Sequence, residues 1–191
     1  MIGNDIIDLE IPISPNWNSS RYLNKLFSSV EQEAILKSDK PTISLQLFWS
    51  WKEAAYKANQ RLFNLPRRYN PLDFHCDIIS EEDKNTHGIV RINSQSYFVL
   101  SRITEANIHS IATLEKNTPT TFKIFQNESL LKDKLFAEYS LLLKEPKSNL
   151  RIQKNESNIP HLYSNDLNTS QVFSLSHHGR FSAYVIALMN C

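Results

Sequence analysis

Residues 48 to 58 read Phe48-Trp49-Ser50-Trp51-Lys52-Glu53-Ala54-Ala55-Tyr56-Lys57-Ala58. Positions i, i+3 and i+4 of a helix share one face, so this stretch predicts an apolar stripe made of Leu47, Trp51, Ala54, Ala55 and Ala58. Trp49, Glu53 and Lys57 form a second row at i, i+4 and i+8. Two interpretations of that row are open. It is either a surface salt bridge worth only about 0.3–0.5 kcal/mol, or a metal ligand followed one turn later by a cation for phosphate.

The composition is that of an ordinary globular protein. The chain has 191 residues, of which 41% are hydrophobic and 21% are charged, which allows one sizeable core or two small lobes that share an interface. The formal net charge of +1 gives no global electrostatic reason to expect nucleic acid or a membrane surface as partner. Any binding of anions must therefore be local.

The cysteines and the N-terminal residues predict a reducing cytoplasm. Cys76 and Cys191 are the two cysteines and neither belongs to a CxxC pair, which argues against a zinc site and a disulfide framework. The first residues lack the basic and long apolar regions of a signal peptide, and no apolar run is long enough for a membrane span.

Glycine is rare, because average usage would give about thirteen in this length and the chain has three. Gly88 follows Asn85-Thr86-His87 and suits a hairpin turn. Gly3 and Gly179 lie inside motifs discussed below, so we expect those positions to need backbone freedom or close approach.

The first half of the chain predicts a buried strand, two helices and a meander. The strand covers residues 1–9, with Asp8 as a turn residue at its end and Asp5 as a buried carboxylate that needs a partner or a metal. A loop at residues 12–24 precedes a short helix that starts at the capping-box spacing Ser28 to Glu31. The long helix runs from about 43 to 59, and residues 73–114 alternate like an antiparallel meander.

The second half predicts a similar arrangement. We expect a strand at 120–125, an amphipathic helix at 128–144, a strand at 149–154, a polar loop through residues 159–162, and a strand, tight loop and strand over 172–188. The predicted fold class is therefore α+β, with two similar lobes, 1–117 and 118–191, each a long helix packed on a small, mostly antiparallel sheet. The functional site is expected at the interface between the lobes.

Three clusters carry the chemistry, and each is weak when taken alone. They are Gly3-x-Asp5, Trp49-x-x-Lys52-Glu53-x-x-x-Lys57 and Ser174-x-Ser176-His177-x-Gly179-Arg180. Two carboxylates with open water positions suit Mg²⁺, and a lysine suits phosphate. The third cluster offers hydrogen-bond donors for phosphate oxygens. Together they predict a diphosphate substrate and metal-assisted phosphoryl transfer, whereas no G-x-S-x-G elbow, P-loop or GxGxxG is present.

These clusters resemble the signatures of the 4′-phosphopantetheinyl transferase superfamily. The matching segments are Gly3-Asn4-Asp5-Ile6, Phe48-Trp49-Ser50-Trp51-Lys52-Glu53-Ala54-x-x-Lys57 and Ser174-Leu175-Ser176-His177-His178-Gly179-Arg180. The resemblance implies an enzyme, active as a holo-acyl-carrier-protein synthase, that moves the 4′-phosphopantetheine arm of coenzyme A onto a serine of an apo carrier protein and releases 3′,5′-ADP. Carrier proteins of fatty-acid, polyketide or peptide synthesis are all possible partners.

The resemblance also implies roles for individual residues. Asp5 and Glu53 would be the Mg²⁺ ligands, and Glu53, or water on the metal, would take the proton from the carrier serine. Lys57 would neutralise charge on the diphosphate and on the departing 3′,5′-ADP. Ser176 and His177 would hold the diphosphate, with Arg180 near by. Lys52 points away from Glu53 because of its i+1 offset.

The order of the motifs is similar to a circularly permuted member of the large, pseudo-twofold type. In large members without the permutation, the Ser-x-Ser-His lobe comes first. Here residues 130–187 resemble that lobe and residues 1–114 resemble the other. The short members of the family share this motif order but work as trimers and have no counterpart of the helix at 128–144. We therefore expect a monomer with one site between its lobes.

The sequence departs from the family pattern at several positions. Ile7 stands where large members often have a second acid, so two protein carboxylates and an extra water are expected. The glycines that usually follow the helix are replaced by Gln60 and Leu62. The lysine of the GKP-like loop is replaced by Ile159, and an expected arginine by Glu128. Lys154, Arg67 or Arg68 could substitute in binding adenine and the 3′-phosphate, and the Arg67-Arg68 pair could equally be a solvated loop.

Two alternatives to an enzyme remain at this level. One is a coenzyme A or carrier-protein binding module without catalysis, against which the retention of Asp5, Glu53 and Lys57 argues, since binding alone does not require this set. The other is a purely structural two-lobe protein, which would leave the buried Asp5 and both motif glycines unexplained.

Overall fold

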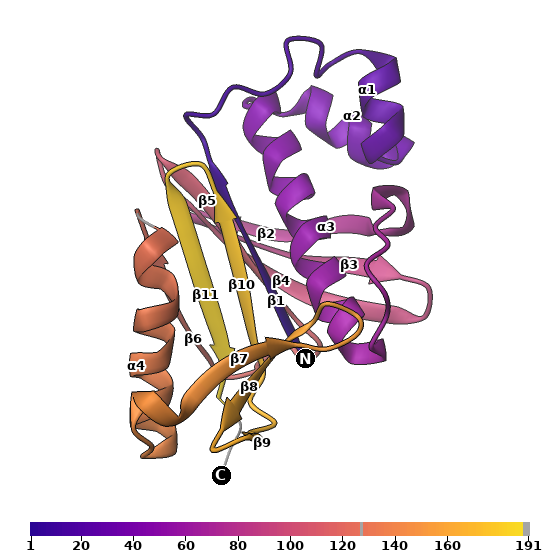
Figure 1. Cartoon of the computed structure of the whole chain (residues 1–191). Coiled ribbons are helices and arrows are strands. Elements are labelled where there is room, and N and C mark those ends of the chain that lie inside the picture. The colour runs from indigo at the N-terminus through magenta and orange to yellow at the C-terminus, as the bar shows by residue number, and fades with distance from the viewer. Residues whose placement is uncertain (127, 189–191) are drawn as a thin grey trace.

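The computed structural model describes residues 1–126 and 128–188, so Cys191 lies outside the described residues. The fold is mixed α and β, with antiparallel sheets and helices on their outer faces, as predicted (Figure 1). Within the described chain, no helix is both long enough and apolar enough to cross a membrane.

A five-stranded antiparallel sheet is built by the first half of the chain. Its strand order is β1 (Ile2–Asp8), β5 (Asn107–Thr113), β4 (Gln95–Ile103), β3 (Asn85–Ile92) and β2 (His75–Glu82). The helix α3 (Pro41–Phe63) lies across one face of this sheet. The short helices α1 (Ser20–Leu26) and α2 (Ser29–Lys37) lie beside the N-terminal part of α3.

The second half forms two smaller sheets and one helix. One sheet has the order β10 (Phe173–His178), β11 (Phe181–Ala187) and β6 (Thr120–Phe125), and α4 (Leu131–Leu143) covers its outer side. The other sheet consists of β7 (Leu150–Lys154), β8 (Pro160–Ser164) and β9 (Leu167–Asn168). Short 3₁₀ turns occupy Pro71–Asp73, Glu128–Leu130 and Lys147–Asn149.

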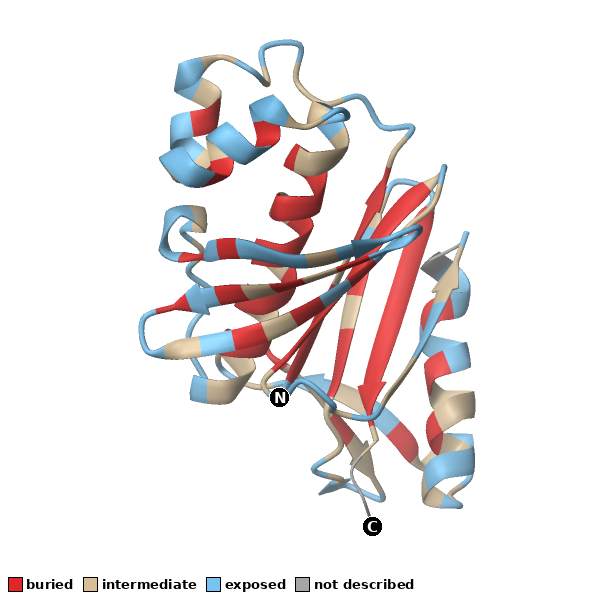
Figure 2. Ribbon diagram, turned by 180° about the vertical axis from the view of Figure 1, so that it is seen from behind, coloured by how far each residue is buried: buried red, intermediate tan, exposed pale blue. Residues whose placement is uncertain are grey.

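The largest core lies between α3 and the five-stranded sheet, and the predicted apolar stripe faces it. Trp51, Ala54, Ala55 and Ala58 have no exposed surface and Leu47 is 3% exposed. A second core joins α4 to β10 and β11. Two small clusters, Ile2 with Ile111, Val185 and Ala187, and Ile6 with Phe181 and Ala183, join β1 and β5 to β11. The most continuously buried elements therefore meet in the middle of the molecule (Figure 2).

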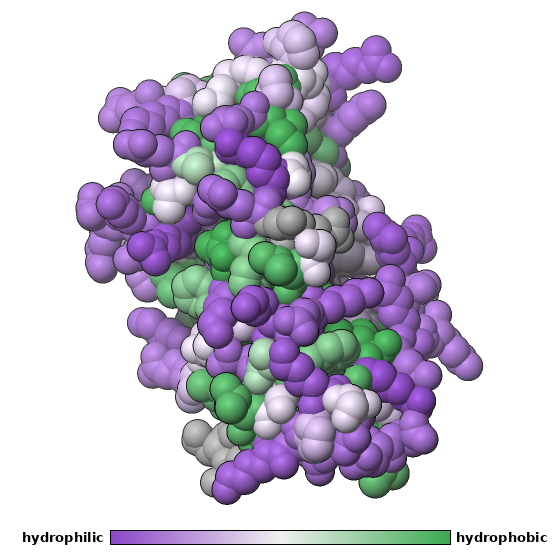
Figure 3. Space-filling model, turned by 60° about the vertical axis from the view of Figure 1, so that its left-hand side comes forward, coloured by the Kyte–Doolittle hydropathy of each residue, from purple (hydrophilic) through white to green (hydrophobic). Residues whose placement is uncertain are grey.

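The outer surface is mixed in character. Figure 3 shows that apolar side chains on the viewed face are divided into small patches by hydrophilic ones. Single exposed apolar side chains such as Leu141, on α4, are normal for a protein surface. The apolar side chains needed for folding are instead in the three contacts described above.

The structure corrects three local predictions. Residues 20–26 form α1 instead of a loop, because Ser19 caps the helix by accepting from the Tyr22 backbone and Leu23 enters the core. The polar loop after residue 154 contains β8 and β9. Gly88 lies in the middle of β3, not in a turn. The residue is a glycine because the Trp51 ring occupies the place of its Cβ and leaves no room for a side chain.

Other predictions are confirmed with changed bounds. Ser28 and Glu31 form the predicted capping box of α2. The long helix is extended at both ends, since Pro41 takes the first helical turn, where its missing N–H costs nothing, and Asn64 ends the helix in a left-handed conformation.

Gly3 sets the distance between β1 and α3. A Cβ at this position would lie 2.7 Å from the Ala58 backbone nitrogen and would collide with the Ala54 carbonyl oxygen. Both atoms belong to helix backbone that cannot move aside, so the strand itself would have to shift. This close approach is the reason for the glycine predicted from the motif.

We predict that Gly3→Ala lowers the free energy of unfolding by about 1–3 kcal/mol, the usual cost of overpacking a core. Urea unfolding followed by tryptophan fluorescence measures this change. The same variant is expected to move Asp5 relative to α3, because the strand that carries Asp5 shifts off the helix. Unchanged stability would show that β1 can shift without cost.

Candidate functional site

The site begins where β1 crosses α3. Asp5 lies on the same face of β1 as Gly3, the face that points to the helix, because residues two positions apart in a strand share a face. Its neighbour on β5 is Ser110. Lys57 reaches across from α3, and its Nζ donates to the Asn4 carbonyl oxygen at 2.9 Å and to Asp5 Oδ1 at 3.2 Å. The side chains of Lys57 and Asp5 remain 28% and 13% exposed, so a ligand can reach both.

Glu53 lies one helical turn before Lys57 and close to Asp5. Burial, and next the nearby charge of Asp5, raise the pKa of Glu53 to about 7, while Lys57 and Arg67 act in the opposite direction. Two carboxylates held near each other in a part-buried site repel one another, and a bound cation relieves that repulsion. Among the described residues no group of three or more His, Cys, Asp or Glu side chains is placed to hold a metal ion.

A pocket of about 490 Å³ opens beside these carboxylates. Asp5, Glu53 and His177 line it, together with Trp49 and His178. Its other walls are mostly apolar and come from β1, the following loop, α1 and α3, among them Ile7, Ile11, Ile13, Tyr22, Leu26 and Leu45. Each of the three sequence motifs therefore contributes at least one residue to the wall of this pocket.

The Ser-x-Ser-His segment reaches this region along β10. Asn4 donates its backbone N–H to Ser174 Oγ and its side-chain Nδ2 to Ser176 Oγ, both at 3.0 Å. Asn4 Nδ2 also lies 3.2 Å from His109 Nε2. Burial, with a smaller contribution from Lys57, lowers the pKa of His109 to about 3. His109 is therefore neutral, and its Nε2 accepts from Asn4.

Arg180 and Lys154 do not line the pocket. The Arg180 guanidinium is paired with Asp8 and with Glu10, and the hydrogen bond from Arg180 holds the pKa of the Asp8 carboxyl well below its usual range. Lys154 is exposed at the end of β7, next to Asn155, which bonds Asn64 at the end of α3. Arg67 and Arg68 are exposed in the loop after α3.

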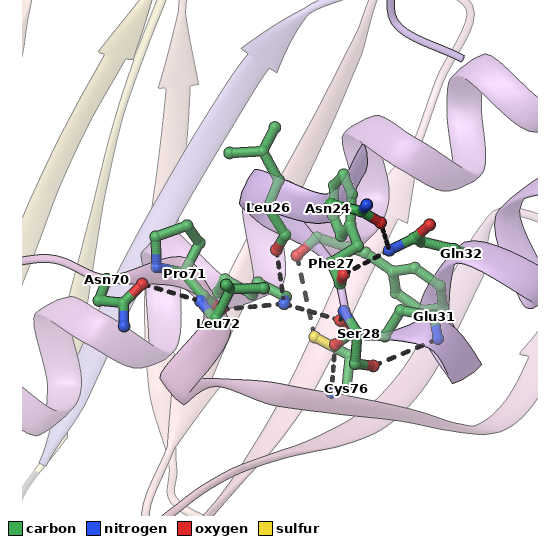
Figure 4. A network of polar contacts seen from close by, with 12 residues as sticks. Asn24, Leu26, Phe27, Ser28, Glu31, Gln32, Asn70, Pro71, Leu72 and Cys76 are labelled. Carbon is green, nitrogen blue, oxygen red and sulfur yellow. Dashed lines mark hydrogen bonds and ion pairs between the residues drawn. The ribbon is translucent and has the colours of Figure 1, made fainter. Parts of the chain in front are cut away.

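Lys52 points away from Glu53, as its offset predicted, and does not line the pocket. Its Nζ is fully buried and donates to the Leu26 carbonyl at 2.9 Å, the Pro71 carbonyl at 3.0 Å and Glu31 Oε2 at 2.8 Å. Glu31 also accepts from the Ser28 and Cys76 backbone, so Leu26, Ser28, Glu31, Pro71 and Cys76 gather in one network (Figure 4). Lys52 thus anchors α3 to α1, to α2 and to the 3₁₀ turn at Pro71–Asp73, and Glu31 extends the network to β2.

Sequence reasoning missed three residues of this region. Asn4 and His109 lie on the opposite face of the sheet from Asp5, and their partners are more than 100 positions away. Asp8 was interpreted as a turn residue, yet its side chain is 1% exposed and fully hydrogen bonded. Its spacing from Arg180 gave no local signal.

Lys52→Met is expected to destabilise the fold by about 3–5 kcal/mol, because it leaves the Glu31 carboxylate buried without its cation. Chemical unfolding measures the loss. Lys37→Met is the matched control, since Lys37 pairs with Glu33 on the exposed surface of α2, where an ion pair contributes little to stability. Equal effects of the two substitutions would contradict this account of Lys52.

The raised pKa of Glu53 predicts a pH-dependent stability in the metal-free protein. The folded state binds this proton more tightly than the unfolded state, whose pKa is the ordinary value of 4.5. The stabilisation is therefore complete below pH 4.5 and is lost as the pH rises through about 7. Glu53→Gln should be more stable than the parent at pH 8, on the order of 2–3 kcal/mol, and similar to it at pH 4.5. Unfolding curves in EDTA across this range test it; a difference independent of pH would contradict it.

Comparison with known proteins comes from a family model. The model of the 4′-phosphopantetheinyl transferase superfamily matches residues 1–121, a range that contains Asp5, Glu53 and Lys57 but not the β10 segment. A search of curated proteins returned no match.

Proposed function

The chain belongs to the 4′-phosphopantetheinyl transferase superfamily, and we propose that it transfers the 4′-phosphopantetheine group of coenzyme A to a serine of an apo carrier protein. The observation that supports this most directly is the meeting of Asp5, Glu53 and Lys57 at the contact between β1 and α3, beside a pocket that His177 also lines. A carboxylate pair, a cation and an imidazole around one cavity match the requirements of a diphosphate substrate.

The proposed reaction is a phosphoryl transfer. The carrier serine oxygen attacks the phosphorus that bears the pantetheine arm and forms a new P–O bond. The bond from that phosphorus to the bridging oxygen breaks, and the oxygen leaves with 3′,5′-ADP. The serine hydroxyl proton passes to Glu53, either directly or through water. A carboxylate beside the reacting hydroxyl can act as the general base for this step.

The chemistry of the carboxylates fits a divalent cation. Asp5 and Glu53 are close enough for Asp5 to raise the Glu53 pKa, and Mg²⁺ commonly uses one or two protein carboxylates and completes its shell with water and phosphate oxygens. Bound there, Mg²⁺ would neutralise charge on the diphosphate. Asp5 and Glu53 are the residues we propose to hold it.

The remaining residues bind and orient the substrate in this proposal. Lys57 faces β1, the strand that carries Asp5. It would neutralise negative charge on the diphosphate and on the departing 3′,5′-ADP. His177 would donate to phosphate oxygens from the other side, while the Ser176 hydroxyl, which accepts from Asn4 and does not line the pocket, would hold β10 against β1. Lys154, Arg67 and Arg68 remain candidates for the adenine and 3′-phosphate. Their exposed positions leave them available to a ligand.

We further propose that residues 1–117 and 118–191 act as two lobes of a monomer, in a circularly permuted order. The contacts of Ser174 and Ser176 with Asn4 of the same chain support a site completed within one molecule. Size-exclusion chromatography with light scattering checks this, since a trimer would favour the arrangement of the short family members.

Incubation of the protein with coenzyme A, Mg²⁺ and several apo carrier proteins tests the reaction. Intact mass spectrometry should show the added phosphopantetheine on the carrier, and none after EDTA. Glu53→Gln is expected to lower transfer at least 1,000-fold while keeping the fold, and Glu33→Gln, on the exposed face of α2, is the control with full activity. Coenzyme A binding without mass addition on any carrier would indicate a binding module instead.

A further inference from the structure

Strands β1 and β10 lie side by side but belong to different sheets (Figure 1). Side-chain hydrogen bonds join them in a parallel order. Asn4 bonds Ser174 and Ser176, and four residues further along, Asp8 bonds His178 and Arg180. The offset between partners is therefore the same at both ends, and the second pair of contacts falls on the turn that follows His177.

The Asp8 carboxylate is the centre of the second contact. Arg180 donates Nε to Oδ2 at 2.9 Å and Nη2 to Oδ1 at 2.7 Å, and its backbone N–H donates to Oδ2 at 2.9 Å. The Asp8 backbone N–H in turn donates to His178 Nδ1 at 2.9 Å. A carboxylate that is 1% exposed is thus held by a bidentate arginine and by the main chain of the turn.

Gly179 shows that the turn is shaped on this carboxylate. Its φ is +55°, a left-handed conformation that favours glycine, and a Cβ there would lie 2.5 Å from Asp8 Oδ2. The backbone can approach Asp8 this closely only without a side chain. The glycine and the arginine of the motif therefore both serve the same contact.

We propose that Asp8 is a positioning residue that holds the end of β10 and the turn after it, residues 177–180, against β1 and so keeps His177 at the diphosphate. This inference rests on the proposed function. It also assigns Arg180 to the contact with Asp8, called the clamp from here on, because Asp8 and Glu10 already pair with its guanidinium. Arg180 is therefore not assigned to coenzyme A. His177 and His178 line the pocket with Asp5 and Glu53, so loosening the clamp moves the phosphate contact of the turn and leaves the carboxylates of β1 and α3 in place.

The test compares steady-state transfer by the parent, Asp8→Asn and Arg180→Gln at saturating carrier protein and variable coenzyme A. Each protein is assayed at least ten degrees below its own melting temperature. We expect both variants to raise the KM for coenzyme A at least tenfold and to change kcat less than threefold. Asp166→Asn is the matched control, because Asp166 pairs with Arg151 on an exposed strand, and its KM should equal that of the parent.

Two further measurements separate this inference from the proposed function. Calorimetry should show at least tenfold weaker coenzyme A binding by the variants, whether or not the parent transfers anything, and ¹H–¹³C spectra should show a shifted His177 ring signal. If Asp8→Asn fails to fold, Arg180→Gln on the exposed side of the clamp carries the test. Unchanged KM and binding, or a loss confined to kcat, would overturn the positioning role. A parent that binds coenzyme A but modifies no carrier would overturn the proposed function alone.

Discussion

The rest of the site depends on the direct contact between the backbone of β1 and the backbone of α3 at Gly3. Strands usually meet helices through side chains, which keep the two backbones apart. Here a glycine on the strand and alanines on the helix remove that spacer. As a result Lys57, from the helix, reaches a carbonyl oxygen of the strand itself. Asp5, Glu53 and Lys57 can share one small site because nothing larger stands between their elements.

This contact must be held firmly, and the interior of the first half supplies the means. Trp51 fills the space under β3 at Gly88 and donates its indole N–H to Ser101 at 2.6 Å. On the neighbouring helical position, Lys52 binds the ends of two other elements and the Glu31 carboxylate. Adjacent residues of one helix thus anchor it to the sheet and to α1 and α2, while Glu53 faces the pocket. A helix fixed at both sides can hold two like charges close together without turning them apart.

The sequence predicted what depends on short-range periodicity and failed where partners are distant. The row of Trp49, Glu53 and Lys57, the buried stripe and the capping box follow from spacing within one helix, and the structure confirms the stripe and the capping box. The helix at residues 20–26 was missed because it is short and its apolar face is brief. Asp8 and Asn4 were missed because their roles depend on residues about 170 positions away, and Gly88 was misplaced because its reason is a ring from another element.

The seam between β1 and β10 has a consequence for how the molecule is assembled. The two halves meet through apolar clusters and side-chain hydrogen bonds, and the hydrogen-bonded strand order of each sheet stays within its own set of strands. An interface of this kind resembles the contact between two subunits more than the inside of a sheet. The covalent link between the two halves is then not needed for the strands of any sheet to pair. Two fragments produced by a cut between β5 and β6 would each carry whole sheets, and their association would form the same interface between β1 and β10. Such an arrangement allows the order of the halves along a gene to change while the seam stays the same.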